Sequence, residues 1–190
     1  MIDELSIDDI WIPDVDIDEA YPLPDSREFV YAVLVRATKQ HIFTREVPHF
    51  FPCKALNPTV TRRKWGHDRS KEFVYNLLPG YVFLFSQEEM QPHLLQDIDG
   101  ILRVLRYSDG SYALTERDEQ LARWLAKYNG KIGMSKAAKV GNKIKVIEGP
   151  LRDQLGLVTE VDRRKQRAKI SFVFNGASFS SWLDFDWIEE

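Results

Sequence analysis

The stretch GNKIKVIEGPLRDQLGLVTEVD, residues 141–162, decides the fold of the second half of the chain. Two short runs of strand-like character flank a turn that is rich in glycine and charge, a pattern typical of paired strands. Gly149 and Gly156 suit turn positions at which a side chain would be costly, and Gly141 opens the unit. The stretch therefore predicts a small β-unit.

The rest of the C-terminal region continues this β pattern. Ala168, Ile170, Phe172 and Phe174 fall on alternate positions, as expected for a strand with one buried face. Closely spaced strands joined by short turns predict a small barrel over residues 141–190. Its expected core also includes eight further apolar residues: Leu155, Leu157, Val161, Phe179, Trp182, Leu183, Phe185 and Trp187.

The region before this barrel mixes strands and helices. The apolar run 29–37 predicts a central strand, and the strand 81–85 follows a Pro-Gly break. A helical pattern after residue 37 is cut short by Pro48. A capping-box spacing predicts a second short helix over 86–95, or one that begins at Pro92 with this proline in its first turn. Asp109–Gly110 predicts a β-hairpin. The spacing of Thr115 and Asp118 approximates a capping box, and the apolar residues from Leu121 to Tyr128 then predict a helix that ends at Gly130. Residues 131–140 are expected to be a linker.

The composition restricts the class of protein. The chain has 190 residues, of which 44% are hydrophobic, enough for a sizeable core. It contains neither an 18-residue apolar run nor a secretory signal pattern, so we expect no membrane span. The single cysteine, Cys53, cannot form an internal disulfide, which favours a reducing cytoplasm. We expect Cys53 to fill space in a core.

The charge is distributed unevenly along the chain. Residues 1–30 carry a net charge of −9, which leaves +6 for residues 31–190 out of a total of −3. A basic body favours polyanionic partners. The acidic leader, residues 1–28, is either a solvated tail or a segment that docks on the basic body and competes with nucleic acid. The alternation at residues 15–18 predicts an edge strand within it.

Two sequence motifs together resemble the NusG family of transcription factors. Residues 141–162 look like a KOW motif, and LLPGYVFLF at residues 77–85 is similar to the PGYV segment of the NusG N-terminal (NGN) domain. The ending LDFDWIE, residues 183–189, is similar to the last strand of the C-terminal domain. The resemblance covers residues 29–190 and implies an α+β fold. An NGN α/β sandwich with an antiparallel-rich sheet over 29–130 precedes an SH3-like KOW barrel over 141–190.

The same resemblance implies a function. Family members bind bacterial RNA polymerase at the clamp helices through the NGN domain, and the barrel recruits a second partner. The break at Pro48, the extra leader and Leu77–Leu78 before Pro-Gly differ from the general factor. They favour a specialised antitermination paralogue, similar to LoaP or RfaH, which acts as a monomer without a cofactor. Nascent RNA, non-template DNA, a ribosomal protein or Rho are the further partners it implies.

The resemblance also assigns candidate contact residues. The expected polymerase-binding residues lie on the leading strand and around the Pro-Gly break: Tyr31, Val33, Leu78, Pro79, Gly80, Tyr81 and Phe83. Strand residues of this type are alternatively ordinary core. Such an apolar, aromatic centre is typical of transient interfaces.

Two basic sets are candidates for nucleic-acid binding, by phosphate contact and by base stacking. The first set lies in the loop predicted between two long strands: Arg62, Arg63, Lys64, Trp65 and Arg69. The alternative is that this loop is only a solvated hairpin tip. The other lies on the barrel and alternatively is a charged surface or a protein contact: Lys143, Lys145, Arg152, Arg163, Arg164, Lys165, Arg167 and Lys169.

The sequence gives little support to catalysis or metal binding. The four histidines, His41, His49, His67 and His93, lack a metal-ligand spacing with Cys53. Nucleophile elbows, phosphate-binding glycine loops and dinucleotide fingerprints are absent from the sequence. The competing hypotheses are a general NusG-type elongation factor coupled to Rho or the ribosome, and a nucleic-acid-processing enzyme that uses the KOW barrel as a binding module.

Overall fold

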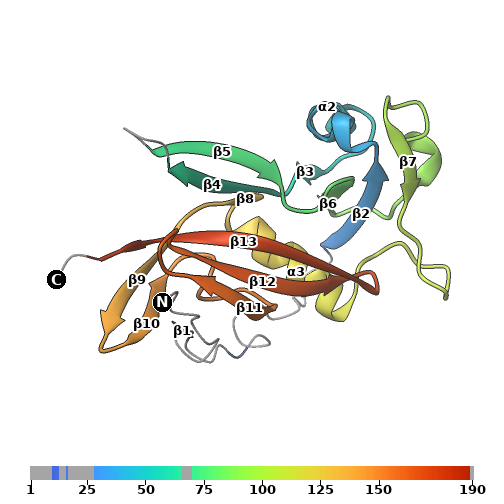
Figure 1. The fold of residues 1–190 in the computed structure, drawn as a ribbon. Helices are drawn as coiled ribbons and strands as arrows, with labels where there is room; N and C mark the ends of the chain where they lie inside the picture. Colours follow the sequence, from blue (N-terminus) through green and yellow to red (C-terminus); the bar gives the residue numbers. More distant parts are fainter. Residues whose placement is uncertain (1–9, 13–15, 17–27, 66–69, 189–190) are drawn as a thin grey trace. The chain divides into compact units, whose positions relative to one another are not determined.

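The computed structural model describes residues 10–12, 16, 28–65 and 70–188, and of Trp65 the backbone alone. The chain forms two compact units, each assembled from separate stretches of sequence (Figure 1). The sandwich unit comprises Pro22–Pro58 and Asn76–Gly130, and the barrel unit comprises Met1–Tyr21, Thr59–Tyr75 and Lys131–Glu190. Within the described residues, no helix is both long and apolar enough to cross a membrane.

The sandwich unit is built on a four-stranded antiparallel sheet in the order β3-β6-β2-β7. The strands are β2 (Phe29–Val35), β3 (Lys54–Leu56), β6 (Tyr81–Ser86) and β7 (Ile101–Val104). β2 pairs with β6 from Phe29↔Ser86 to Leu34↔Tyr81 and with β7 on its other side. Its continuous apolar run is thus explained by a central position with both faces covered.

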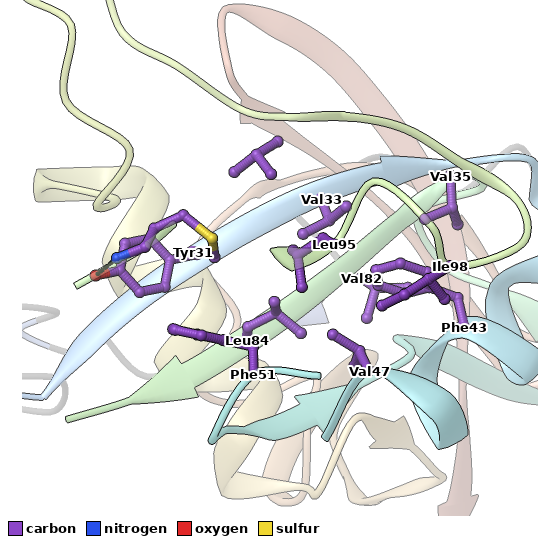
Figure 2. Close-up of a cluster of buried hydrophobic side chains, with 12 residues drawn as sticks. Tyr31, Val33, Val35, Phe43, Val47, Phe51, Val82, Leu84, Leu95 and Ile98 are labelled. Carbon is purple, nitrogen blue, oxygen red and sulfur yellow. Dashed lines mark hydrogen bonds between the residues drawn. The ribbon is translucent and has the colours of Figure 1, made fainter. Parts of the chain in front are cut away.

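One face of this sheet packs on a cluster of buried hydrophobic side chains. Figure 2 shows Tyr31, Val33 and Val35 of β2 beside Val82 and Leu84 of β6. The helical segments α2 (Gln40–Glu46) and η3 (Val47–His49) close this face with Phe43 and Val47, and Phe51, Leu95 and Ile98 complete it. The short helix η2 (Ala37–Lys39) leads into α2. As the sequence predicts, the α-helix stops just before Pro48, which lies in the 3-10 turn η3.

Residues on the alternate strand positions, such as Ala32 and Phe83, are fully buried on the opposite face. The helix α3 (Glu116–Lys127) supplies Leu121, Trp124 and Leu125, all almost completely buried, to the same unit. Thr115 is the N-cap of α3, as predicted, but makes no side-chain cap bond, and Asp118 instead accepts a hydrogen bond from the Tyr107 hydroxyl. At the other end, the Gly130 N–H donates to the Leu125 carbonyl at 2.8 Å.

Two sequence predictions in this unit are wrong in part. Residues 86–95 form only the 3-10 turn η4 (Pro92–Leu94), because Pro92 starts the turn and the preceding backbone is extended. The predicted hairpin around Asp109–Gly110 forms its turn, with Tyr107 N–H donating to the Ser111 carbonyl. Its second arm is not a strand on β7, since Leu114 N–H bonds to the Val30 carbonyl of β2.

The barrel unit contains a six-stranded sheet in the order β1-β10-β9-β13-β12-β11. Its strands are β1 (Ile10–Trp11), β9 (Ser135–Val140), β10 (Lys143–Glu148), β11 (Leu157–Asp162), β12 (Arg167–Phe174) and β13 (Ala177–Trp187). The long strand β13 is antiparallel to β12 and then parallel to β9, which curls the sheet into a nearly closed SH3-like barrel.

The turn glycines of the motif sit where the sequence predicts turns. Gly149 has φ of +96°, and a Cβ there would lie 2.7 Å from Ser135 Cα. A Cβ on Gly156 would overlap the Ser171 carbonyl of the neighbouring strand, so this position has no room for a side chain. Gly141, with φ of +61°, has no atom within 4 Å of such a Cβ.

The barrel core matches the predicted one only in part, because Leu183 and Phe185 are buried whereas five other predicted residues are only partly buried: Leu155, Val161, Phe179, Trp182 and Trp187. Ile144, Val146, Ala168, Ile170, Leu183 and Phe185 are all buried. Leu157, predicted as core, is 75% exposed, because it begins the strand β11 at the end of the sheet. Residues 131–140 form strands where the sequence predicts a linker, since β8 (Lys131–Ile132) and β9 both pair with other strands.

The strands β4 (Thr59–Trp65) and β5 (Ser70–Asn76), apart from the last residue of β5, belong to the barrel unit. They form a three-stranded sheet in the order β5-β4-β8, and β4 pairs with β8 in parallel at Thr59↔Lys131 and Val60↔Ile132. The two long strands are thus confirmed, but Arg62, Arg63 and Lys64 lie on β4 rather than in the connecting loop.

Candidate partner and nucleic-acid interfaces

The Pro-Gly turn before β6 is held by one buried amide, that of Gln40. The Gln40 Oε1 accepts hydrogen bonds from the Gly80 N–H at 2.9 Å and from Asn76 Nδ2 at 2.7 Å. Its Nε2 lies 2.9 Å from the Tyr81 carbonyl and 3.1 Å from the Leu78 carbonyl. Gly80 has φ of +90°, which favours glycine. The turn therefore has a defined shape, fixed from the first residue of α2.

The structure separates the predicted polymerase-binding set into buried and exposed members. Tyr31, Val33, Leu78 and Phe83 have at most 2% of their surface exposed, and Gly80 is buried as well. Pro79 is exposed and Tyr81 is partly exposed, so the turn itself presents a surface. Tyr31 has an internal role, because its hydroxyl donates to the Glu88 carbonyl and accepts from the Met90 N–H, each at 3.0 Å. The polymerase contact of this set stays a prediction.

The basic strand β4 contacts the last strand of the barrel. The Arg63 guanidinium binds the Asp186 carboxylate in a bidentate manner, at 2.7 Å and 3.1 Å, and its Nη2 also lies 3.0 Å from the Met134 sulfur. The Arg63 backbone N–H donates to Asp184 Oδ2 at 2.5 Å. Leu183, Asp184 and Phe185 are consecutive buried residues of β13, so both faces of the strand are covered there.

Asp184 is a buried carboxylate in a positively charged setting. Its burial raises its pKa, and the opposing influences are the Arg63 N–H and the charges of Arg167, Arg62 and Arg63. The Asp186 hydrogen bond in turn raises the pKa of Arg63. Arg62 lies with its guanidinium carbon 3.9 Å from the Tyr75 ring centroid. Two of the cations that the sequence assigns to nucleic acid therefore hold β4, β5 and the barrel together.

Cross-strand pairs organise the basic residues of β12. Lys169 lies opposite Glu160 on one side and Trp182 on the other, and its Nζ is 2.6 Å from Glu160 Oε1. Arg167 lies 4.3 Å from the Trp182 ring centroid, while its Nε is 3.5 Å from Asp162 Oδ2. Carboxylates and an aromatic ring thus engage these two cations. Trp182 is half-buried beside them, whereas the sequence predicted it in the barrel core.

The other predicted basic residues differ in exposure. Arg164 and Lys165 are exposed in the turn between β11 and β12, where Lys165 Nζ lies 3.7 Å from Asp162. Arg163 is partly buried. Lys143 and Arg152 are exposed near the two ends of β10, and Lys145 is half-buried within it. Lys64 is exposed on β4, whereas Arg69 and the Trp65 side chain lie outside the described residues.

Sequence reasoning missed the residues that organise these surfaces. Gln40, Asp184 and Asp186 carry no motif, and their hydrogen-bond partners lie 17 to 123 residues away along the chain. The sequence of β13 held one signal for them. Asp184 and Asp186 are two residues apart and so lie on the same face of the strand, where two carboxylates indicate nearby cations. Cys53 packs against the sandwich core, and burial raises its pKa to about 11, consistent with the space-filling role predicted for it.

Comparisons with known proteins agree with this architecture. The family model of the KOW motif matches residues 140–171, which cover β10, β11 and the first half of β12. The chain is 26% identical over 162 residues to the transcription termination/antitermination protein NusG of Buchnera aphidicola from Acyrthosiphon pisum, covering 83% of this chain and 88% of that protein.

Two further proteins are similar over most of the chain. NusG of Rickettsia conorii is 28% identical over 151 residues, covering 78% of each chain. A solved structure described as domain interaction in Thermotoga maritima NusG matches with a TM-score of 0.50 and 19% identity, covering 83% of this chain and 93% of the other. That structural likeness supports the fold of the sandwich and the barrel.

Proposed function

The chain belongs to the NusG family, and from this premise we propose that it is a transcription antitermination and processivity factor that acts on bacterial RNA polymerase. The observation that carries the proposal is that this chain combines an NGN-type sandwich with a KOW barrel. Its relatives are named transcription termination/antitermination proteins. The proposed activity is binding without a chemical step. The named relatives support this, since they are transcription proteins.

The sandwich unit is the proposed polymerase-binding part. Its Pro-Gly turn is rigid because Gln40 fixes Gly80, and Pro79 is exposed at its tip beside the partly exposed Tyr81. A fixed apolar and aromatic turn loses little conformational entropy when it binds a partner. We propose that this turn contacts the polymerase clamp helices, while the buried members of the predicted set support it from behind.

The barrel unit is the proposed second binding part, and nascent RNA is its preferred partner. Arg164 and Lys165 project from the turn between β11 and β12, and Lys143 and Arg152 lie exposed near the two ends of β10. Such cations bind phosphates with a steep salt dependence. Binding two partners through one chain raises the effective concentration of RNA at the polymerase.

Terminator readthrough in a purified bacterial transcription reaction tests this function. The template carries an intrinsic terminator behind a candidate leader RNA, and readthrough is measured with and without the protein. We expect raised readthrough that depends on the leader RNA. Unchanged readthrough with retained polymerase binding would favour the general elongation factor, and turnover of an RNA substrate would favour a processing enzyme. A protein without polymerase binding would refute the proposal.

A further inference from the structure

The strand β10 of the barrel has an unusual neighbour. On one side it pairs with β9, and on the other it pairs in parallel with β1 from the acidic leader. The register is Ile10↔Ile144 and Trp11↔Lys145. β1 and β11 are the two ends of this sheet, so the leader lies on an edge of the barrel that its other strands leave open.

The side chains add a second contact to this backbone pairing. Lys145 Nζ lies 4.6 Å from the centroid of the Trp11 ring, within the range of a cation–π interaction. Trp11 remains 48% exposed, so it covers the lysine without entering the core. Carboxylates at Asp8, Asp9, Asp14 and Asp16 flank β1 in the sequence, which matches the positive charge of β10.

The backbone pairing at the β10 edge suits a protein segment better than a nucleic acid. An open strand edge presents N–H and C=O groups that only another backbone satisfies regularly, whereas a nucleic acid would satisfy the lysines alone. β1 is only two residues long, so little energy holds it in place and a longer strand competes well. The edge therefore has the properties of a docking site with a weak internal occupant.

We propose that the β10 edge is a docking site for an extended acidic segment of a protein partner that carries an aromatic residue, and that Ile10–Trp11 occupies this site within the chain until the partner displaces it. The aromatic residue of the partner takes the place of Trp11 on Lys145, and its backbone extends the sheet beyond β10. This inference is independent of the polymerase contact and of the RNA contact.

A peptide with the sequence of residues 3–18 is the probe, since it carries the chemistry of the occupant. Its fluorescein-labelled form is titrated by anisotropy into the full-length chain and into the full-length variant Ile10→Pro/Trp11→Ala. If β1 occupies the edge for nine-tenths of the time, the variant binds the peptide about tenfold more tightly than the native chain. A scrambled peptide of the same composition is expected to bind neither.

Two lysines provide a matched pair of controls. In the variant background, Lys145→Ala is expected to weaken peptide binding about two- to fivefold, because the cation–π contact is lost. Lys139→Ala is expected to leave it unchanged, since Lys139 lies over Trp187 at 5.1 Å and not over Trp11. Ile10→Pro alone, which removes one backbone donor, serves as a second release variant and is expected to give an intermediate affinity.

Several outcomes would overturn the inference. Equal affinity of the native chain and both release variants would mean that β1 does not occupy the peptide site, and absence of binding to all of them would mean that no such site exists. If the variants bound single-stranded RNA more tightly but the peptide no better, the leader would act only by competing with RNA phosphates for the lysines, and no strand-docking site would exist. The readthrough assay of the native chain reports on the proposed function separately.

Discussion

The Gln40 side chain and the Gly80 backbone N–H, 40 residues apart in the sequence, meet in a buried hydrogen bond of 2.9 Å. Gln40 is 1% exposed, and its amide also satisfies groups of Asn76, Leu78 and Tyr81. A single side chain thus joins the start of α2 to the turn before β6. The shape of the exposed Pro79 turn depends on a residue that itself never reaches the surface.

Gln40→Met is expected to lower the free energy of unfolding by about 2–3 kcal/mol, because buried backbone groups lose their partners. Urea denaturation followed by circular dichroism measures this change. Gln87→Met, at an exposed position, is the control and is expected to have little effect. Equal stability of the two variants would show that water replaces the Gln40 amide.

Arg63→Ala is expected to destabilise the attachment of β4 to the barrel by about 2 kcal/mol, because Asp186 loses its bidentate guanidinium partner while the backbone bond to Asp184 remains. Amide hydrogen exchange along β4 is expected to speed up more than exchange in β2. Lys64→Ala, at the neighbouring exposed position, is the control. A uniform change in both strands would indicate global destabilisation instead.

Gly156→Ala is expected to lower the free energy of unfolding by about 3 kcal/mol, since the new methyl group overlaps the Ser171 carbonyl. Gly141→Ala, where the added atom has open space, is expected to cost only about 1 kcal/mol for its left-handed backbone. Thermal unfolding of the two variants gives the comparison. A cost for Gly141→Ala as large as that for Gly156→Ala would contradict the steric explanation.

The thiol of Cys53 gives the stability a defined pH dependence. Its pKa is raised from 9.0 to about 11, so the unfolded thiol ionises before the folded one. The stability it contributes is complete below pH 9 and is lost as the pH rises through about 11. Cys53→Ala is expected to flatten the unfolding free energy over this window relative to the native chain. A thiol that iodoacetamide alkylates with a midpoint near 9 would refute the raised pKa.

The RNA contact proposed for the barrel predicts the effect of a charge reversal. Arg164→Glu/Lys165→Glu is expected to weaken single-stranded RNA binding more than tenfold at low salt and to reduce its salt dependence, because about two phosphate contacts are lost. Filter binding at several salt concentrations measures both. Glu160→Gln/Lys169→Gln removes an existing ion pair without reversing charge and is the control. Unchanged RNA affinity would favour a protein partner for this turn.

Local patterns predicted the strands and one helix well, because alternation and capping act over a few residues. β2, β6, β12 and α3 were recoverable in this way, and the paired motifs indicated the family. The environment of each charge was not recoverable, because it depends on partners far away in the sequence. Arg63 looked like a phosphate ligand until Asp184, 121 residues later, placed it against the barrel. Leu157 looked like core because the sequence does not show which strand ends a sheet.

The interleaving of the two units has a consequence for the order in which the protein forms during synthesis. The sandwich unit has all its residues once Gly130 has left the ribosome. β4 and β5 emerge before that point, yet the partner of Arg63 on β13 is made 123 residues after it. A nascent chain halted before residue 177 would carry a complete sandwich while Arg63 of β4 still lacks Asp184 and Asp186. The charge of Arg63 is therefore neutralised only after β13, whose Asp186 is translated 123 residues later, has emerged.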